Sequence, residues 1–384
     1  MGRDKNDASP QDCSMELSST LSWLVDSAAD GAGADRFLAE LGTHLLADGL
    51  TLAGGALTLD IPHPLIARTT WLWRADNGEV IEALGFAPGA PSAATPGSAP
   101  VNDAGRRWLA TIAAGPVHED TIGPQHDGPL LTWIGPHAFT SSETVVLRQV
   151  ARFAAAPLAV LATRATLKAA LEAYLGRRSA ARVLTAPLRR DIGETIQAAL
   201  LYADLRGFTA LSESQSPAAV ISALDAWFDR IGGAVHAFGG EVLKFIGDGI
   251  LAIFPVAGGA SRGACDAALR AVSAAHIGMA HLDEQRIRQG LPALPFGAAL
   301  HLGEILWGNI GAADRLDFTA IGPAVNLVSR LEGLCKSLQQ TVLVSGALAA
   351  ETEMPLTALG KHELRGIAAP CEVFAFPDER NSAS

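Results

Sequence analysis

The chain has 384 residues, of which 49% are hydrophobic and 18% are charged, and its formal net charge is −11. This length fits two domains and a connecting segment, and the composition is that of a globular protein rather than of a disordered or collagen-like chain. The excess of acidic residues argues against nucleic acid as a partner, because binding to phosphates needs a clustered basic surface that no stretch of this sequence supplies.

The cysteines and the apolar runs indicate the compartment. The four cysteines lie far apart, without a CxxC pair, at Cys13, Cys265, Cys335 and Cys371, so neither a zinc site nor a disulfide framework is expected. The longest uninterrupted apolar run, residues 153–162, is half of the ~20 residues that a membrane span needs. No signal peptide opens the chain. We therefore expect a soluble, cytoplasmic protein without a membrane span.

The N-terminal part begins with residues 1–20, which are polar and are expected to be disordered. From residue 21 to 46 apolar residues recur at helical spacing. Residues 70–73 and 79–86 predict a β-hairpin, because the Asn-Gly pair between them suits a tight turn. Residues 88–100 are rich in Pro, Ala, Gly and Ser and predict a long surface loop or a disordered insertion.

A further strand is predicted at residues 130–134, and a helix begins at residue 141 and runs to Leu175 with a kink at Pro157. Helices flanking a small sheet are typical of sensory modules of the GAF or PAS kind. Residues 21–172 are therefore predicted to be an α+β regulatory domain, although no motif identifies its ligand or signal. Five of the seven tryptophans lie in this domain, and we interpret them as core residues rather than as the lining of a ligand pocket.

Residues 173–193 are predicted to be a helical connector, and residues 194–377 a second α+β domain followed by a tail, 378–384. The order of elements in the second domain is that of a ferredoxin-like βαββαβ core with a C-terminal extension. The predicted elements are strand 196–203, helix 217–238, hairpin 241–254, helix 260–288, strands 296–302 and 305–309, helix 323–338 and strand 341–345.

Two aspartates follow apolar strands of the second domain. Asp204 ends one strand, and Gly207 shortly after it lets the backbone turn and direct successive N–H groups at an anion. Asp248 lies in the two-glycine turn of the hairpin. Carboxylates at the ends of neighbouring strands can hold a pair of Mg²⁺ ions, which prefer oxygen ligands and accompany phosphates. Taken singly, Asp204 is also a plausible cap of the next turn, and Asp248 a common hairpin residue.

A helix that starts at Pro323 places Asn326 and Arg330 one turn apart on the same face. Taken alone, Arg330 could equally be an exposed helix residue that pairs with Glu332 or Glu304.

Together these features resemble the catalytic domain of the class III adenylyl and guanylyl cyclases. The resemblance covers residues 194–377, nearly half of the chain. Any one motif is weak, but four in order at this spacing are strong. They are Asp204-Leu205-Arg206-Gly207-Phe208-Thr209, Lys244 to Asp248, His301 to Gly311 and Gly322 to Arg330.

The resemblance implies an enzyme that converts ATP to 3′,5′-cyclic AMP and pyrophosphate, with two Mg²⁺ or Mn²⁺ ions in each active site. Asp204, the carbonyl group of Leu205 and Asp248 would bind the metal ions. The backbone that would bind the phosphates is that of Arg206, Gly207, Phe208 and Thr209.

The same resemblance implies a homodimer with its active sites at the interface, since in the family the metal-binding aspartates come from one subunit and the Asn and Arg from its partner. Asn326 would orient the ribose, and Arg330 would stabilise the charge that develops on the α-phosphate. Arg365 lies where relatives often offer a basic residue to the terminal phosphates.

Base selection in the family falls to two positions, matched here by Lys244 and Thr319. Lys244 would donate to adenine N1, and Thr319 identifies the subclass of adenylyl cyclases that carry Thr where many members carry Asp. The alternatives are a guanylyl cyclase, or a non-catalytic module of this fold that binds nucleotide and relays a signal. A diguanylate cyclase is excluded, because the Gly-Gly-Asp/Glu-Glu-Phe hairpin signature is missing.

Overall fold

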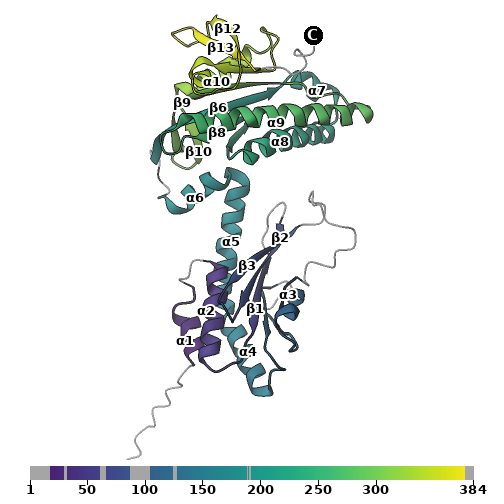
Figure 1. Ribbon diagram of the computed structural model, residues 1–384, viewed down its shortest axis with the longest axis vertical. Helices are drawn as coiled ribbons and strands as arrows, with labels where there is room; N and C mark the ends of the chain where they lie inside the picture. The colour runs from purple at the N-terminus through teal and green to yellow at the C-terminus, as the bar shows by residue number, and fades with distance from the viewer. Residues whose placement is uncertain are drawn as a thin grey trace, which may run out of the picture. The chain divides into compact units, whose positions relative to one another are not determined.

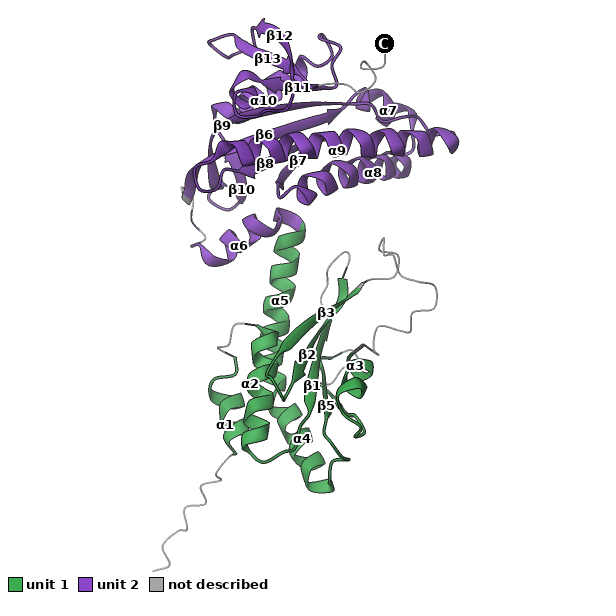
Figure 2. Ribbon diagram, in the orientation of Figure 1, with its two compact units in different colours: residues 1–173 green, residues 174–384 purple. Residues whose placement is uncertain are grey.

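The structure is a computed structural model of the chain, and it describes residues 18–29, 33–60, 66–86, 104–123, 128–187, 189 and 192–376. The chain divides into two compact units, residues 1–173 and 174–384 (Figure 2). The predicted loop 88–100 and tail 378–384 lie outside the described residues, as does the predicted disordered N-terminus up to residue 17. A helix begins at Ser19, within the segment for which disorder was predicted.

Unit 1 contains a five-stranded antiparallel sheet with the strand order β3-β2-β1-β5-β4 (Figure 1). Its last helix, α5, crosses the boundary between the units. The elements are α1 (Ser19–Asp26), α2 (Ala34–Ala47), β1 (Gly54–Asp60), β2 (Ile66–Arg74), β3 (Val80–Phe86), α3 (Ala104–Ile112), β4 (His118–Thr121), β5 (Leu130–Ile134), α4 (Ser141–Phe153) and α5 (Ala155–Leu175).

Alternating side chains of β1 face helices on opposite sides of this sheet. Leu57 packs into a cluster with residues of α1, α2, α4 and α5, whereas Ala56 packs with residues of α3. Trp73 and Trp133 belong to the first cluster and are 2% and 1% exposed, so these two are core residues, as interpreted from the sequence. The predicted α+β architecture is confirmed, and a likeness to a GAF or PAS domain stays a prediction.

The long helix predicted from residue 141 to Leu175 is two helices, α4 and α5, bent by 48° at their junction. The kink predicted at Pro157 is misplaced. Pro157 lies in the first turn of α5, where the absent N–H removes no helical hydrogen bond. Among the described residues no single helix is both long and apolar enough to cross a membrane, and α4 and α5 reach that length and composition only as a bent pair.

Unit 2 is built on an eight-stranded sheet with the order β12-β13-β11-β9-β6-β8-β7, in which β10 pairs with β9. The strand order β9-β6-β8-β7, with α8 and α9 as the connecting helices, is the predicted ferredoxin-like βαββαβ core. The elements are α6 (Arg177–Thr185), β6 (Ile192–Leu205), α7 (Phe208–Ser214), α8 (Pro217–Ala237), β7 (Glu241–Ile246), β8 (Gly249–Pro255), α9 (Ser261–Arg288), β9 (Phe296–Gly311), β10 (Leu316–Ile321), α10 (Pro323–Gly333), β11 (Val342–Ser345), α11 (Gly346–Ala349), β12 (Thr357–His362) and β13 (Cys371–Ala375).

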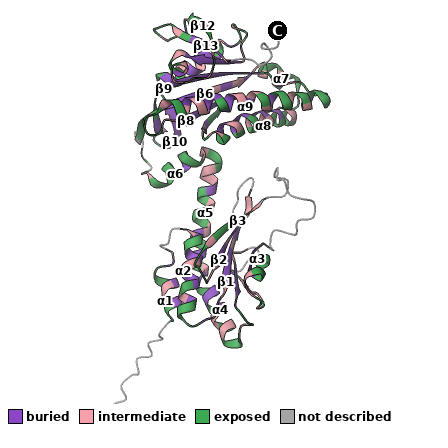
Figure 3. Ribbon diagram, in the orientation of Figure 1, coloured by how far each residue is buried: buried purple, intermediate pink, exposed green. Residues whose placement is uncertain are grey.

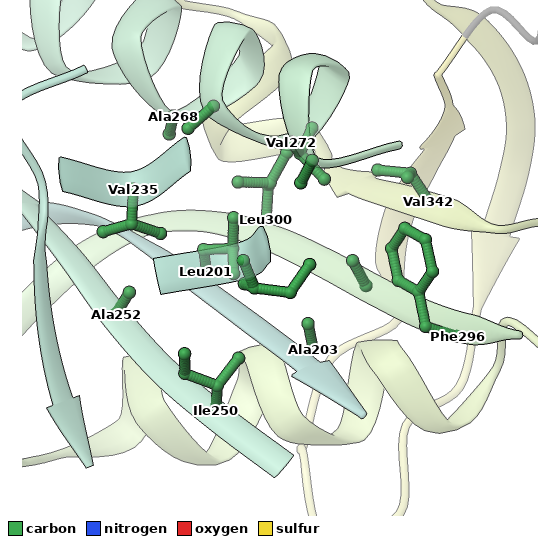
Figure 4. Close-up of a cluster of buried hydrophobic side chains, with 14 of the residues drawn as sticks. Leu201, Ala203, Val235, Ile250, Ala252, Ala268, Val272, Phe296, Leu300 and Val342 are labelled. Atoms are coloured by element: carbon green, nitrogen blue, oxygen red, sulfur yellow. The ribbon is translucent and has the colours of Figure 1, made fainter. Parts of the chain in front are cut away.

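Helices cover both faces of this sheet, and Figure 3 shows buried strands between helices whose outer sides are exposed. Leu201 and Ala203 of β6 pack with α8 and α9 in the cluster drawn in Figure 4. Ala198 and Leu200 pack with α10 on the other face. Because side chains alternate along a strand, Asp204 at the end of β6 lies on the face that α10 covers.

The strands predicted at 296–302 and 305–309 are one strand, β9, and the helix predicted for 323–338 ends at Gly333. Residues 303–304, which separated the two predicted strands, continue β9. Gly303 allows close packing, since a Cβ atom on Gly303 would lie 2.6 Å from the Cβ of Ala324 in α10. The glycine therefore lets α10 approach the sheet.

Buried polar contacts hold α6 on unit 2. The backbone N–H and the hydroxyl of Ser179 donate to Glu241 Oε1 at 2.9 and 2.6 Å, and both residues are buried. Arg182 lies over the ring of Trp307 at 4.6 Å and pairs with Glu194. Since Glu241 opens β7, α6 is attached to the strand that leads to the hairpin turn.

Candidate active site

Strand register brings Asp204 and Asp248 together. Ala203 pairs with Ile250 on β8, so Asp204 lies opposite Gly249 and beside Asp248. Burial, followed by the proximity of the Asp248 carboxyl group, raises the pKa of Asp204 to about 7. Two carboxylates held so closely in a half-buried position repel each other when both are ionised. A cation between them would remove that repulsion.

The β7–β8 turn fixes Asp248 through its backbone. The turn has two residues, and the first, Gly247, has a φ of 65°, which glycine adopts without strain. Trp227 of α8 is fully buried and donates its Nε1 hydrogen to the carbonyl oxygen of Asp248 at 2.9 Å. The turn is therefore anchored to the core while its carboxylate reaches Asp204.

The chain turns sharply after Leu205, whose side chain is buried in the core beneath α8 and α9. The Arg206 N–H donates to the carbonyl oxygen of Pro295 at 2.7 Å, and Gly207, with a φ of 73°, precedes Phe208 and Thr209 in the first turn of α7. A cavity of about 590 Å³ opens beside this turn, between residues 205–215 and 290–295. The predicted phosphate-binding backbone thus borders an open space directly after Asp204.

An ion pair ties the end of β6 to α10. Arg206 Nη2 lies 2.8 Å from Glu332 Oε1, although without hydrogen-bond geometry, and the Glu332 side chain is 7% exposed. Burial raises the pKa of Glu332 and the Arg206 charge opposes that shift. The pair occupies the space over Gly297, the residue of β9 that faces Asp204, and a Cβ atom on Gly297 would overlap both side chains. Glu332 therefore pairs with Arg206 rather than with Arg330.

Lys244 of β7 forms an ion pair with Asp317 of β10. Thr319 lies two residues further along β10, on the same face as Asp317, and is 9% exposed. The strands that carry the two predicted base-reading residues are therefore in contact. Asp317 was not predicted, because it lies 73 residues from Lys244 in the sequence and belongs to none of the motifs.

Asn326 and Arg330 lie on the exposed face of α10, and within the described part of the chain neither side chain is engaged in a hydrogen bond or ion pair. Residues two apart on a helix point about 200° apart. Since Glu332 contacts Arg206 beside Asp204, Arg330 points away from the acidic pair of its own chain. Arg365 also lies apart, in an exposed turn after β12 at the sheet edge opposite β7.

The acidic pair fits a hard divalent cation. Carboxylate and carbonyl oxygens are the donors that Mg²⁺ prefers, and Mg²⁺ is commonly bound by one or two carboxylates together with substrate phosphates and water. Among the described residues no group of three or more His, Cys, Asp or Glu side chains could hold a metal ion. A Mg²⁺ or Mn²⁺ ion bound here would have Asp204, Asp248 and the carbonyl group of Leu205 as protein ligands and would take its remaining oxygen ligands from water or a phosphorylated substrate.

Comparison with known proteins finds similarity over the residues of unit 2. Residues 192–376 match the model of the adenylate and guanylate cyclase catalytic domain. The chain is 32% identical over 160 residues to the adenylate cyclase of Anabaena cylindrica, covering 41% of this chain and 31% of that protein. It is 30% identical over 176 residues to adenylate cyclase 1 of Rhizobium meliloti (strain 1021), covering 45% of this chain and 26% of that protein. The match thus spans less than a third of either relative.

Among solved structures, a bacterial light-regulated adenylyl cyclase matches 67% of this chain and 84% of its own, with a TM-score of 0.50 and 19% identity. This likeness concerns the fold alone. It agrees with the α+β architecture described above.

Because the space over Gly297 is filled, replacing this glycine should lower the stability, whereas replacing an exposed glycine should not. Gly297→Ala should displace the Arg206 guanidinium and leave Glu332 buried without its partner, which should lower the stability by about 1–3 kcal/mol. Gly233→Ala is the matched control, since Gly233 is exposed on α8 and a Cβ there meets nothing within 4 Å. Thermal denaturation should show a lower Tm for the first variant and an equal or higher Tm for the second. Equal Tm values would contradict the packing role of Gly297.

The raised pKa of Asp204 predicts how Mg²⁺ stabilises the protein. Without metal, ionisation of Asp204 costs more in the folded than in the unfolded chain, so its contribution to stability is present below about pH 4 and is lost as the pH rises through 7. Mg²⁺ should therefore raise the Tm more at pH 8 than at pH 6, because it binds the ionised pair. Asp204→Asn should remove most of the Mg²⁺ effect. A Mg²⁺ shift that is equal at both pH values, or that survives in Asp204→Asn, would refute the metal site.

Proposed function

Since residues 192–376 belong to the family of adenylate and guanylate cyclase catalytic domains, we propose that this protein converts ATP to 3′,5′-cyclic AMP and pyrophosphate. The observation that carries the proposal is the pair formed by Asp204 and Asp248, two half-buried carboxylates at the ends of adjacent strands. A site of this kind suits the binding of a triphosphate together with divalent cations.

The chain's own residues would act mainly by positioning and electrostatics. Asp204, Asp248 and the Leu205 carbonyl hold the two Mg²⁺ or Mn²⁺ ions. When bound, these ions lower the pKa of the ribose 3′-hydroxyl group and neutralise the triphosphate. The backbone N–H groups of Gly207, Phe208 and Thr209 donate to the phosphate oxygens. No side chain of the site is an obvious general base, so the proton of the 3′-hydroxyl group would pass to water or to the substrate, and pyrophosphate would leave.

The adenine base is assigned to Lys244 and Thr319. The Lys244 ammonium group donates to adenine N1, and the Thr319 hydroxyl group contacts the same base. Thr donates as well as accepts, so it discriminates less firmly between bases than a carboxylate does. The assignment to ATP rather than GTP is supported by these two residue types and by the two adenylate cyclases that the chain resembles.

The active site is proposed to be shared between two copies of the chain. Asn326 and Arg330 point away from the acidic pair of their own subunit, so they serve the pair of the partner, where Asn326 orients the ribose and Arg330 stabilises the charge on the α-phosphate. Arg365 would contact the terminal phosphates. Exposed apolar side chains on β7, β9 and β10 supply a surface for such a dimer: Phe245, Ile246, Leu306 and Ile321, which are 40–54% exposed.

Unit 1 is proposed to regulate this activity through a ligand or signal that is not identified. The buried contact of Ser179 with Glu241 supports a role of α6 as the connector, because it joins the helix to the strand that bears Lys244. A cytoplasmic setting is proposed from the cysteines. Cys265, Cys335 and Cys371 are free thiols, and burial raises the pKa of the first two to about 12.

Cyclisation is expected to depend on metal and on the acidic pair. The protein should release cyclic AMP from ATP with Mg²⁺ or Mn²⁺ and none with EDTA, and Asp248→Ala should lower kcat about a hundredfold or more. Asp225→Ala, on the exposed surface of α8, is the control and should retain full activity. Mass spectrometry identifies the product, and circular dichroism shows whether both variants are folded. Normal activity in a folded Asp248→Ala variant would exclude the metal assignment.

Exchange of the base-reading residues is expected to shift nucleotide preference. Lys244→Glu combined with Thr319→Cys introduces the residue types that guanylyl cyclases typically carry, so the ratio of kcat/KM for ATP to that for GTP should fall about tenfold or more. Steady-state kinetics with both nucleotides measure the ratio. If it is unchanged, the base is read elsewhere.

A further inference from the structure

The ion pair between Lys244 and Asp317 joins the predicted base-reading lysine to a carboxylate that no motif identified. The two residues come from different strands, β7 and β10, and their side chains are 42% and 45% exposed. An ion pair that is this exposed contributes little to the free energy of unfolding. Stabilisation of the fold therefore does not account for this ion pair, and its location beside Thr319 points to another role.

The carboxylate of Asp317 lies on the base-reading face of β10. Phe318 and Ala320 point into the core beside α10, so Asp317 and Thr319 share the opposite face. The ion pair holds the long Lys244 side chain against this face. A lysine that is already ordered loses less conformational entropy when it donates to a ligand.

We propose that Asp317 positions Lys244 for base recognition and thereby sets the preference for adenine, an inference that rests on the proposed function. The ammonium group has three N–H donors. One can donate to Asp317 while another donates to adenine N1. Asp317 acts through Lys244 and is therefore a positioning residue.

The charge of Asp317 also bears on how the site distinguishes adenine from guanine, which a lysine alone does poorly. A free ammonium group can donate equally to adenine N1 or to guanine O6. A carboxylate beside it repels guanine O6 and is compatible with the amino group of adenine. In this chain, Thr319 stands where many family members carry Asp, and Asp317 supplies a negative charge two residues away on the same strand face.

The test compares Asp317→Asn with the wild-type full-length protein, with kcat and KM measured for ATP and for GTP. KM for ATP should rise about tenfold while kcat changes little, and the ATP-to-GTP ratio of kcat/KM should fall by a similar factor. Asp317→Glu should restore much of the ratio. The control is Glu353→Gln, which breaks the exposed ion pair of Arg262 and Glu353, 59% and 81% exposed, and should leave both the ratio and the Tm unchanged.

A double-mutant cycle tests whether Asp317 acts through Lys244. In a Lys244→Met background, Asp317→Asn should have no further effect on the ratio. An equal effect in both backgrounds, or an unchanged ratio in Asp317→Asn beside a wild type that makes cyclic AMP, overturns this inference alone. A wild type that cyclises neither nucleotide overturns the proposed function, and this inference with it.

Discussion

Repulsion between two carboxylates is the constraint on which the rest of the site depends. Asp204 and Asp248 are held side by side by strand register, and Asp204 has a pKa of about 7 because its ionised form is partly buried and faces a second acid. Such an arrangement lowers the stability of the metal-free protein above neutral pH. Under the proposed function, cations and a triphosphate would turn the same repulsion into binding.

Contacts in the surrounding structure hold the elements next to this acidic pair in place. Trp227 anchors the backbone of Asp248, and the Arg206–Glu332 pair connects the end of β6 to α10. Strand β7 makes polar contacts with two other elements, since Glu241 at its start accepts hydrogen bonds from Ser179 of α6, and Lys244 pairs with Asp317 of β10. A displacement of α6 would therefore act on the strand that carries Lys244 before it reaches the turn that carries Asp248.

Local patterns predicted much of the fold, whereas the candidate site residues came from the resemblance of four motifs, and their roles stay predictions. The apolar strands, the Asn-Gly turn and the ferredoxin-like order of elements could be predicted, because each follows from residues that are close together in the sequence. The break between α4 and α5 was misplaced, because the first turn of a helix tolerates a proline. The packing of Gly303 against α10 was not predicted, because a close approach by a helix cannot be read from one strand. Asp317 and the Arg206–Glu332 pair were missed for the same reason: their partners are distant in sequence and meet only through packing.

The central claim is that one functional site needs the acidic pair of one subunit and the exposed face of α10 from another. It is tested most directly by mixing two inactive variants, Asp204→Ala and Arg330→Ala. With free subunit exchange, about half of the dimers are mixed and each holds one intact site, so activity should recover to roughly a quarter of wild type. A mixture that stays as inactive as its components, although subunit exchange is verified, would contradict the shared site and favour one contained within a single chain.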